Sequence, residues 1–118
     1  MNEKVFKDRT KQLAIAILRM VEEMPRSISA DVLARQIVRS GTSIGANYRA
    51  ACRAKSTADM INKLKIVEEE SDESAYWLEL MVEAGYLSQE KVSPIIKETN
   101  EILAMTVASI KTLRSRKS

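Results

Sequence analysis

Apolar residues recur at steps of three and four along most of the chain, which is the spacing of one face of an α-helix. The longest series continues through a glycine without a change of phase: Leu33, Ile37, Gly41, Ile44, Tyr48 and Ala51. A loop would normally reset that phase, so we predict a single helix that includes Gly41 and Gly45. Each glycine costs a helix roughly 1 kcal/mol relative to alanine. We therefore expect a large group to approach this helix closely at the two glycines.

Four amphipathic stretches of this kind are predicted to form helices, at about residues 3–24, 29–55, 57–84 and 88–114. Pro25 ends the first, because the residue before a proline disfavours the helical conformation. Ser29 or Asp31 is suited to cap the second helix. Ser56 opens the third, with Asp59 in the place of the Glu or Gln of a capping box.

The fourth helix is less well defined at its start. Gly85 is a suitable residue just past the third helix, and Ser88 is a suitable cap for the fourth. Pro94 lies beyond the first turn, so either the fourth helix kinks there or Ser93 is its true N-cap. Four helices with short connections predict an all-α fold, a single antiparallel up-and-down four-helix bundle over residues 1–118. A three-helix bundle with a fused first pair is the alternative, and Pro25 argues against it.

Composition narrows the class of protein. The 118 residues suffice for one domain, and 45% apolar with 30% charged residues is an ordinary globular balance. We find neither an apolar run of roughly 20 residues, as a membrane span needs, nor the apolar core of a secretory signal. Cys52 is the single cysteine, which excludes an internal disulfide and fits a reducing cytoplasm. The chain lacks histidine, which excludes Glu-x-x-His di-iron sites and nucleophile–histidine dyads. We expect a cytoplasmic protein without a cofactor or metal.

The predicted topology separates the charges along the bundle. One end collects the start of the first helix, the turn between the second and third, and the end of the fourth. Thirteen of the 19 Lys and Arg lie there, with three of the 16 Asp and Glu. The net charges of the two ends are then about +10 and about −7, in a chain of net charge +3. Such charge runs are often only solvated surface; the alternative is a docking surface for phosphate-rich or acidic partners.

We predict that this positive end contacts the backbone of RNA or DNA. Aromatic residues for base stacking are nearly absent from it, since Phe6 and Tyr48 are both predicted to be buried. Sequence-selective recognition of single strands is therefore not expected. Arg9 and Lys65 belong to the same end, and the residues predicted to bind are Lys4, Lys7, Lys11, Arg49, Arg53, Lys55, Lys63, Lys111, Arg114, Arg116 and Lys117.

The hairpin of the second and third helices predicts specific contacts. If it turns near Ser56, residues equally distant from the turn face each other, which pairs Gly41 with Ser71 and Arg39 with Glu73. The first pair, small against small, would explain a glycine in the middle of a helix. We interpret the Arg39–Glu73 pair as a structural ion pair near the core, where removing one partner costs more than the pair contributes.

Carboxylates on the third and fourth helices offer an alternative function. They line helical faces at spacings of three and four residues: Glu69, Glu70, Glu73, Glu98 and Glu101. Such faces hold Mg²⁺ in all-α nucleotide pyrophosphohydrolases. A glutamate-rich helix produces the same spacing by chance, so a solvated face is the preferred interpretation and Mg²⁺-dependent hydrolysis the alternative. A purely structural interaction protein is a third possibility.

Small polar residues and the cysteine have structural interpretations. Ser40, Ser43 and Asn47 form a stripe on the second helix, with Thr42 beside it. No histidine is available to activate a serine, so we interpret the stripe as polar packing or an interhelical hydrogen-bond seam. We interpret Cys52 as a small buried residue, although three cationic neighbours would lower its pKa: Arg49, Arg53 and Lys55.

The second and third helices resemble a known family. The stretches RQIVRSGTSIGANYRAACRAKS and ADMINKLKIVEEESDESAYWLEL resemble the four-helix-bundle proteins encoded in intervening sequences of bacterial large-subunit ribosomal RNA genes. Three positions depart from the family's pattern, with Ala50 for glutamate, Met60 for phenylalanine and Ser74 for threonine. The pattern matches about half the chain through Arg39, Ser40, Ser43, Ile44, Ala46, Asn47, Tyr48, Ala51, Ser56, Asp59, Lys63, Leu64, Glu70, Glu73, Tyr76, Trp77 and Leu78.

The resemblance implies a non-enzymatic homo-oligomer. Five copies are favoured because the family is similar to the accessory protein of diversity-generating retroelements, a basic pentameric bundle that binds nucleic acid and reverse transcriptase. The sequence agrees with self-association, because Ile15 and Leu18 lie beyond the apolar seam of the first helix. Together with the small face of the second helix they exceed what one bundle buries. Tyr76 and Trp77 are predicted to anchor the core or an interface.

Overall fold

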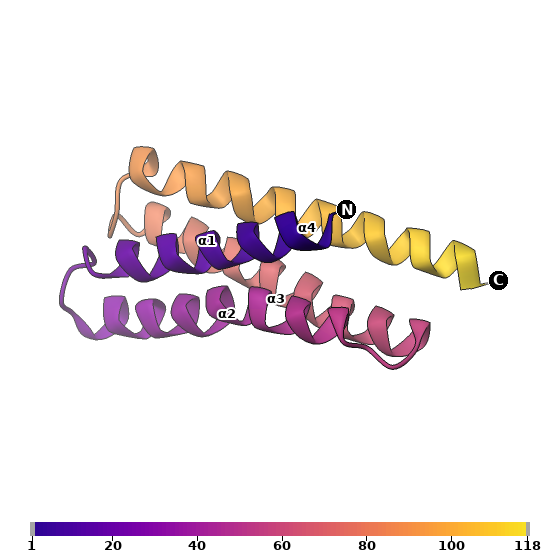
Figure 1. Ribbon diagram of the computed structural model, residues 1–118. Helices are drawn as coiled ribbons and strands as arrows, with labels where there is room; N and C mark the ends of the chain where they lie inside the picture. The colour runs from indigo at the N-terminus through magenta and orange to yellow at the C-terminus, as the bar shows by residue number, and fades with distance from the viewer. Residues whose placement is uncertain (1, 118) are drawn as a thin grey trace.

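Four α-helices make up the computed structural model, which describes residues 2–116 in full and residue 117 through its backbone. The side chain of Lys117, a predicted nucleic-acid contact, lies outside the described residues. The helices run up and down along one bundle (Figure 1). Contact between α2 and α3 is the most extensive, and contact between α1 and α4 the least. This confirms the predicted all-α bundle. The bounds are α1 Glu3–Val21, α2 Ile28–Cys52, α3 Thr57–Glu83 and α4 Gln89–Lys117.

The first two helices are shorter at their C-terminal ends than predicted. α1 ends three residues early, in a turn where the Met24 amide donates to the Val21 carbonyl at 3.1 Å. α2 is capped by Ser27, whose Oγ accepts from the Ala30 amide at 3.2 Å, so the predicted caps were wrong. One of them, Ser29, instead makes a hydrogen bond with the hydroxyl of Tyr86 beyond α3. α2 ends at Cys52, three residues before the predicted end.

The predicted turn between α2 and α3 and the end of α3 are confirmed. Ser56 caps α3, and its Oγ accepts from the Asp59 amide at 3.0 Å. Gly85, just past the C-cap, has a φ of 79°, which a residue with a Cβ rarely adopts. The Tyr86 amide donates to the Met81 carbonyl at 2.9 Å, which closes the end of α3 in a Schellman-like turn.

α4 starts at its first candidate cap and runs through the proline. The Ser88 Oγ accepts from the Lys91 amide at 3.2 Å. Pro94 lies inside the helix, so Ser93 is not the N-cap. Pro94 is exposed on α4. Because proline has no backbone N–H, the carbonyl of Glu90, four residues earlier, has no amide donor at that position of the helix.

α2 is continuous through both glycines because α1 packs directly against them. A Cβ placed on Gly41 would lie 2.5 Å from Cδ1 of Ile17, and one on Gly45 would lie 3.0 Å from Oγ1 of Thr10. The expected close approach is therefore confirmed. Its predicted cause was wrong, since the nearest atoms at Gly41 belong to Ile17 of α1 and not to Ser71 of α3.

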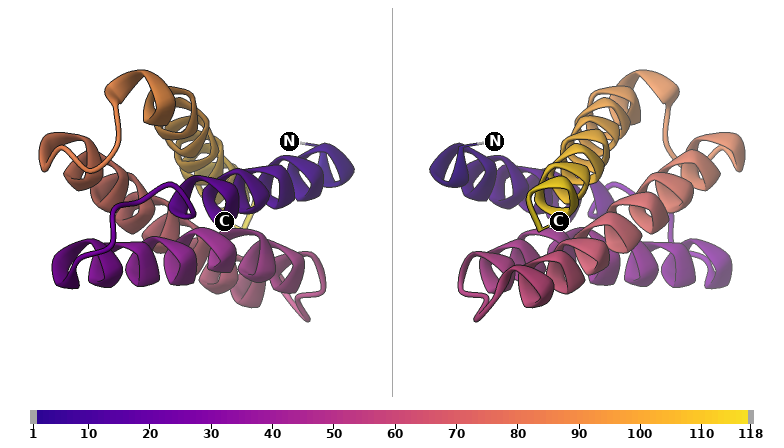
Figure 2. Two further views of the ribbon diagram at one scale, coloured as in Figure 1. Left: turned by 90° about the vertical axis from the view of Figure 1, so that its left-hand side faces the viewer. Right: turned by 90° about the vertical axis from the view of Figure 1, so that its right-hand side faces the viewer.

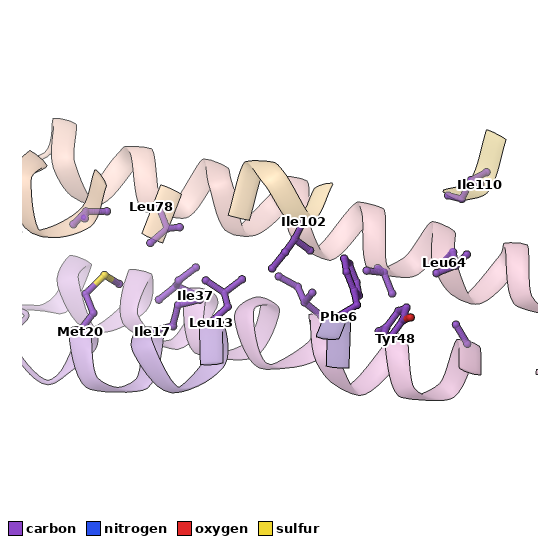
Figure 3. Packing of buried hydrophobic residues seen from close by; sticks show 14 of the residues in the cluster. Phe6, Leu13, Ile17, Met20, Ile37, Tyr48, Leu64, Leu78, Ile102 and Ile110 are labelled. Atoms are coloured by element: carbon purple, nitrogen blue, oxygen red, sulfur yellow. The ribbon is translucent and has the colours of Figure 1, made fainter. Parts of the chain in front are cut away.

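All four helices contribute to one core along the bundle axis (Figure 3). The rings of Phe6 and Tyr48 lie 4.5 Å apart between their centroids, which fixes the start of α1 against the second half of α2. Both aromatic residues are buried, as predicted. The largest fully buried side chains are Phe6, Ile17, Ile37, Ile44, Leu64, Leu78, Met81 and Ile102.

α1 is too short to line the whole bundle. Its 19 residues span about 28 Å, whereas the 29 residues of α4 span about 43 Å. The N-terminus accordingly lies partway along the bundle, and the end of α4 projects past it (Figure 1). The helix axes are also inclined to one another (Figure 2). At the end of the bundle where α4 finishes, the core therefore lies between α2, α3 and α4.

Candidate nucleic-acid interface

The end of α2, the start of α3 and the end of α4 lie together at one end of the molecule (Figure 1). Seven lysines and arginines lie there, and their side chains are exposed, except that of Lys63, which is half-buried. We call these cations the basic end: Arg49, Arg53, Lys55, Lys63, Lys111, Arg114 and Arg116.

The cations of α1 lie elsewhere, because α1 begins partway along the bundle. Arg9 donates from Nε and Nη2 to the carboxylate of Glu98, at 2.9 and 2.6 Å, and from Nη2 to Glu101 at 3.3 Å. Glu98 is 19 residues before the end of α4, so Lys11 lies near the middle of the bundle. The sequence-based division into two charged ends was therefore too sharp. Lys4 and Lys7 are the exceptions, because they lie at the start of α1, where Lys7 is 3.9 Å from Glu3 and acts on Cys52 beside the basic end.

Cations of the basic end make no ion pair within the described part of the chain. The paired cations lie in α1, in the middle of α2 and at the start of α4. Lys7 is 3.9 Å from Glu3, Arg9 holds two carboxylates, and Lys91 contacts Glu23. Exposed cations without a carboxylate partner are available to an external anion at little cost.

The predicted contact between Arg39 and Glu73 is present, but it is not near the core. Arg39 also reaches Glu70 at 3.5 Å, and Glu73 accepts from Trp77 Nε1 at 3.2 Å. The side chains of Arg39 and Glu73 are 49% and 35% exposed. Solvent therefore weakens this pair. Burial raises the pKa of Glu70, and the charge of Arg39 opposes that shift.

The carboxylates required for a Mg²⁺ site are not gathered together. Glu98 and Glu101 are held by Arg9 between α1 and α4, whereas Glu70 and Glu73 are held by Arg39 between α2 and α3. No group of three or more metal-ligating side chains occurs among the described residues. The two arginines thus account for four of the five glutamates, and the fifth, Glu69, is exposed.

The polar stripe of α2 is satisfied mostly by its own helix. Thr42 and Ser43 donate to carbonyls one turn earlier, at 2.6 Å each, and Asn47 donates to the Ser43 carbonyl at 2.8 Å. The interhelical part of the predicted seam is one buried hydrogen bond, from Ser74 to Ser40 at 2.8 Å. The stripe thus packs α2 against α3 and offers no nucleophile with a base.

A groove that was not predicted from the sequence opens beside the start of α1, where Glu3 lines it. It has a volume of about 440 Å³ and lies between the end of α2, the start of α3 and the last three turns of α4. We call it the end groove. Its walls include Tyr48, Cys52, Leu64, Met105 and Arg116. The sequence does indicate that the first helix is shorter than the fourth. The position of the groove, however, depends on where α1 lies along α4, which the contact of Arg9 with Glu98 fixes.

Cys52, on the wall of the end groove, has a raised pKa. Burial is the main cause, and a contact with the Glu3 carboxylate adds to it, whereas Tyr48 and Lys7 oppose it. The shift has the opposite direction to the one that the cationic sequence neighbours suggested. Burial also raises the pKa of Tyr48. Both groups are therefore neutral at pH 7.

Comparison with known proteins finds a matching family and a similar solved structure. The sequence model described as 23S rRNA-intervening sequence protein matches residues 3–108. A crystal structure of a protein with unknown function from the S23 ribosomal protein family of Bacteroides thetaiotaomicron VPI-5482 is 39% identical, with a TM-score of 0.86. The alignment covers 94% of this chain and 99% of that one. No curated protein matches. Among the described residues, no helix has the length and apolar character that crossing a membrane requires.

Proposed function

The chain belongs to the 23S rRNA-intervening sequence protein family, and from this premise we propose that it binds the backbone of RNA or DNA as an oligomer. The observation that carries the proposal is the basic end. Seven cations from the end of α2, the following turn, the start of α3 and the end of α4 converge there, and within the described part of the chain none of their side chains makes an ion pair. Such a surface attracts phosphates, because each neutralised phosphate releases condensed counterions.

The chemistry of the basic end favours backbone contacts over base contacts. Its side chains are lysines and arginines, whereas the nearby aromatic residues Phe6 and Tyr48 are buried in the core. Base stacking on aromatic rings therefore has no platform at this end. Lysine and arginine contacts to phosphate fix position but carry no sequence information. Binding is weakly selective and strongly dependent on salt.

Self-association is supported by apolar side chains on the outside of the α1–α2 hairpin. Leu18, Ile28 and Val32 are 44%, 88% and 50% exposed. Next to them a shallow apolar depression lies over Ala34 and Val38. Apolar surface of this kind usually marks a contact with another protein. Copies joined through this face with their bundles side by side would present their basic ends together. Five copies are favoured by the family resemblance.

A pair of charge reversals at the end of α2 tests the proposal. Arg49 and Arg53 are exposed, so Arg49→Glu with Arg53→Glu should leave the fold intact. The affinity for unrelated duplexes should fall about equally, and the slope of log K against log salt should become shallower by about two. The matched control reverses Arg26 and Lys97, two exposed cations far from the basic end. Equal losses from both double variants would contradict a site at the basic end.

A further inference from the structure

The end groove lies in the position that a continuation of α1 would occupy. α1 faces α4 along one stripe, where Arg9 contacts Glu98 and Glu101 and donates from Nη1 to Met105 Sδ at 3.2 Å. The same stripe continues past Met105 at helical spacing to Arg116, and these residues line the groove. From Met105 to Arg116 the stripe is about 16 Å long. The groove therefore lies where α2, α3 and α4 extend beyond the start of α1.

The walls of the groove have the composition of a helix-packing surface. Met60 and Leu64 of α3, Met105, Ala108 and Leu113 of α4 supply apolar contacts from two sides. Polar side chains also line the groove, among them Ser109, Thr112 and Arg116. Methionine is common on surfaces that accept another helix, because its flexible side chain adapts to different shapes. Tyr48 and Cys52, which are neutral at pH 7, add no charge to the floor.

The charge around the groove is positive. Arg116 lines it, and Arg53 and Lys63 lie on the adjoining turns of α2 and α3. None of these three makes an ion pair within the described residues. One carboxylate lines the groove, Glu3, and it is 3.9 Å from Lys7. An occupant with acidic side chains beside its apolar face would therefore meet complementary charges.

We propose that the end groove binds an acidic amphipathic helix of a partner protein. Apolar side chains at positions i, i+3, i+4 and i+7 of that helix enter between α3 and α4, as in other helix-in-groove complexes. Acidic residues on its flanks contact Arg116 and the cations beside it. The docked helix completes the four-helix cross-section in line with α1. This interaction does not depend on the proposed binding of nucleic acid, although the two ligands share some cations.

Nucleic acid and the partner helix differ in what they need from the groove. A phosphate backbone needs the cations and gains nothing from the apolar walls. An apolar helix needs the walls, and a groove that is partly open to solvent accepts a helix better than a small molecule, which is usually enclosed on most sides. Substitutions in the walls therefore separate the two ligands.

The probe is a fluorescently labelled synthetic helix of about 15 residues with leucine at i, i+3, i+4 and i+7 and glutamate on both flanks. Two matched peptides serve as controls: one has lysine in place of glutamate, and the other has the leucines moved around the helix. Fluorescence anisotropy with the full chain should show saturable binding of the acidic peptide and much weaker binding of both controls. Equal binding of the three peptides, or no saturation below about 1 mM, overturns the proposal.

Variants of the protein locate the binding. Ser109→Trp fills the groove and should raise the Kd of the acidic peptide at least about tenfold. Asn100→Trp, on the opposite side of α4, should leave the Kd unchanged. Ser109 is half-buried, so its replacement also tests packing of α4; Arg116→Glu therefore gives a second variant on an exposed residue, with Arg26→Glu as its control. Arg116→Glu should weaken the acidic peptide and strengthen the lysine peptide.

The same variants separate this inference from the proposed function. Ser109→Trp removes no charge, so it should leave the affinity for duplex unchanged. If the duplex binds but the acidic peptide does not, the groove proposal fails and the proposed function stands. If the peptide binds and the duplex does not, the proposed function fails and the groove proposal stands. A change in the sedimentation coefficient of Ser109→Trp, without peptide binding to the unaltered protein, would show that a second copy fills the groove, and would overturn the proposal.

Discussion

Individual residues decide how tightly α1 packs on α2. Ile17 and Thr10 lie in the space that side chains at positions 41 and 45 would fill. Glycine at position 41 therefore admits the Ile17 side chain into the core, where it is fully buried. The helical cost of the glycine is offset by this closer packing.

Enlarging position 41 should destabilise the bundle. Gly41→Leu forces Ile17 out of its site, and overpacking of a core costs about 1–3 kcal/mol of the free energy of unfolding. Ala46→Leu, an exposed position one turn later, should change that free energy by less than about 0.5 kcal/mol. Urea denaturation followed by circular dichroism measures both. An unchanged midpoint for Gly41→Leu would show that α1 does not rest on Gly41.

The thiol of Cys52 should react slowly with alkylating reagents. Burial raises its pKa, so at a given pH a smaller fraction is thiolate than in the unfolded chain. Because the pKa of Cys52 is higher in the folded protein than in the unfolded chain, protonation of this thiol stabilises the folded state. This contribution to the free energy of unfolding is complete below the unfolded pKa and is lost as pH rises through the folded pKa. Rates of reaction with iodoacetamide against pH should have a higher midpoint for the folded protein than for the same protein in urea. A lower folded midpoint would restore the cationic neighbours as the dominant influence.

Residue-level prediction from the sequence succeeded where neighbours come from one hairpin. The contact of Arg39 with Glu73 follows from the turn at Ser56, because that turn fixes which residues of α2 and α3 meet. The partner of Gly41 was missed because it comes from α1, whose register is fixed by packing across the core. The burial of Arg39 was misjudged for a related reason: distance from a turn gives the pairing but not the rotation of the helix.

At the scale of whole helices, one arginine links α1 to α4 in addition to the apolar core that they share. Contact between these two helices is the least extensive in the bundle. Arg9 spans it with two hydrogen bonds to Glu98 and one to Glu101. The Arg9 and Glu98 side chains are 27% and 31% exposed, so solvent weakens this pair less than the Arg39 pair. Glu98 and Glu101, two of the carboxylates considered for a metal site, thus position α1.

Removing this arginine should loosen α1. Arg9→Met keeps the length of the side chain but leaves Glu98 without its charged partner, which should cost about 1–3 kcal/mol of stability. Hydrogen exchange should become faster in α1 than in α3. Arg19→Met, an exposed cation of the same helix, is the matched control and should change little. Uniformly unchanged exchange in Arg9→Met would mean that apolar packing alone holds α1.

The helices themselves were predictable, and their ends less so. The 3.6-residue period identified all four, since each buries one face in the same core. Ser56 and Gly85 were recognised because each has a distinctive local geometry. Ser27 was missed because several residues near the start of α2 are acceptable caps, and the contact of Ser29 with Tyr86 selects among them. The open question at Pro94 was settled by the cap at Ser88, which lies before Pro94 and before the alternative cap Ser93.

At the scale of the whole molecule, charge and apolar surface are distributed unevenly. The described structure is 50 Å long and about 21 Å wide, so the basic end is well separated from the acidic residues near the start of α4. The topology made this asymmetry predictable. The end groove was not predictable, because it depends on the relative position of α1 and α4 rather than on the pattern within any helix.

Self-association should depend on the outer face of α2. Sedimentation velocity at micromolar concentration should show an oligomer for the unaltered chain. Ile28→Glu with Val32→Glu should shift it toward the monomer, because two charges would be buried in an apolar contact. Asn100→Glu, exposed on α4, should leave the oligomer intact. A monomer for the unaltered chain at micromolar concentration would contradict the proposed assembly.

The most direct test of backbone binding through the basic end is the salt dependence of affinity. The unaltered protein is titrated with a structured RNA and with a random-sequence duplex at several salt concentrations. If about five phosphates are neutralised, log K should fall linearly with log salt, with a slope of about −4 or steeper for the duplex. The structured RNA should show a similarly steep dependence. Absence of binding even at low salt, or a slope near zero, would mean that the positive charge serves only to keep the protein in solution.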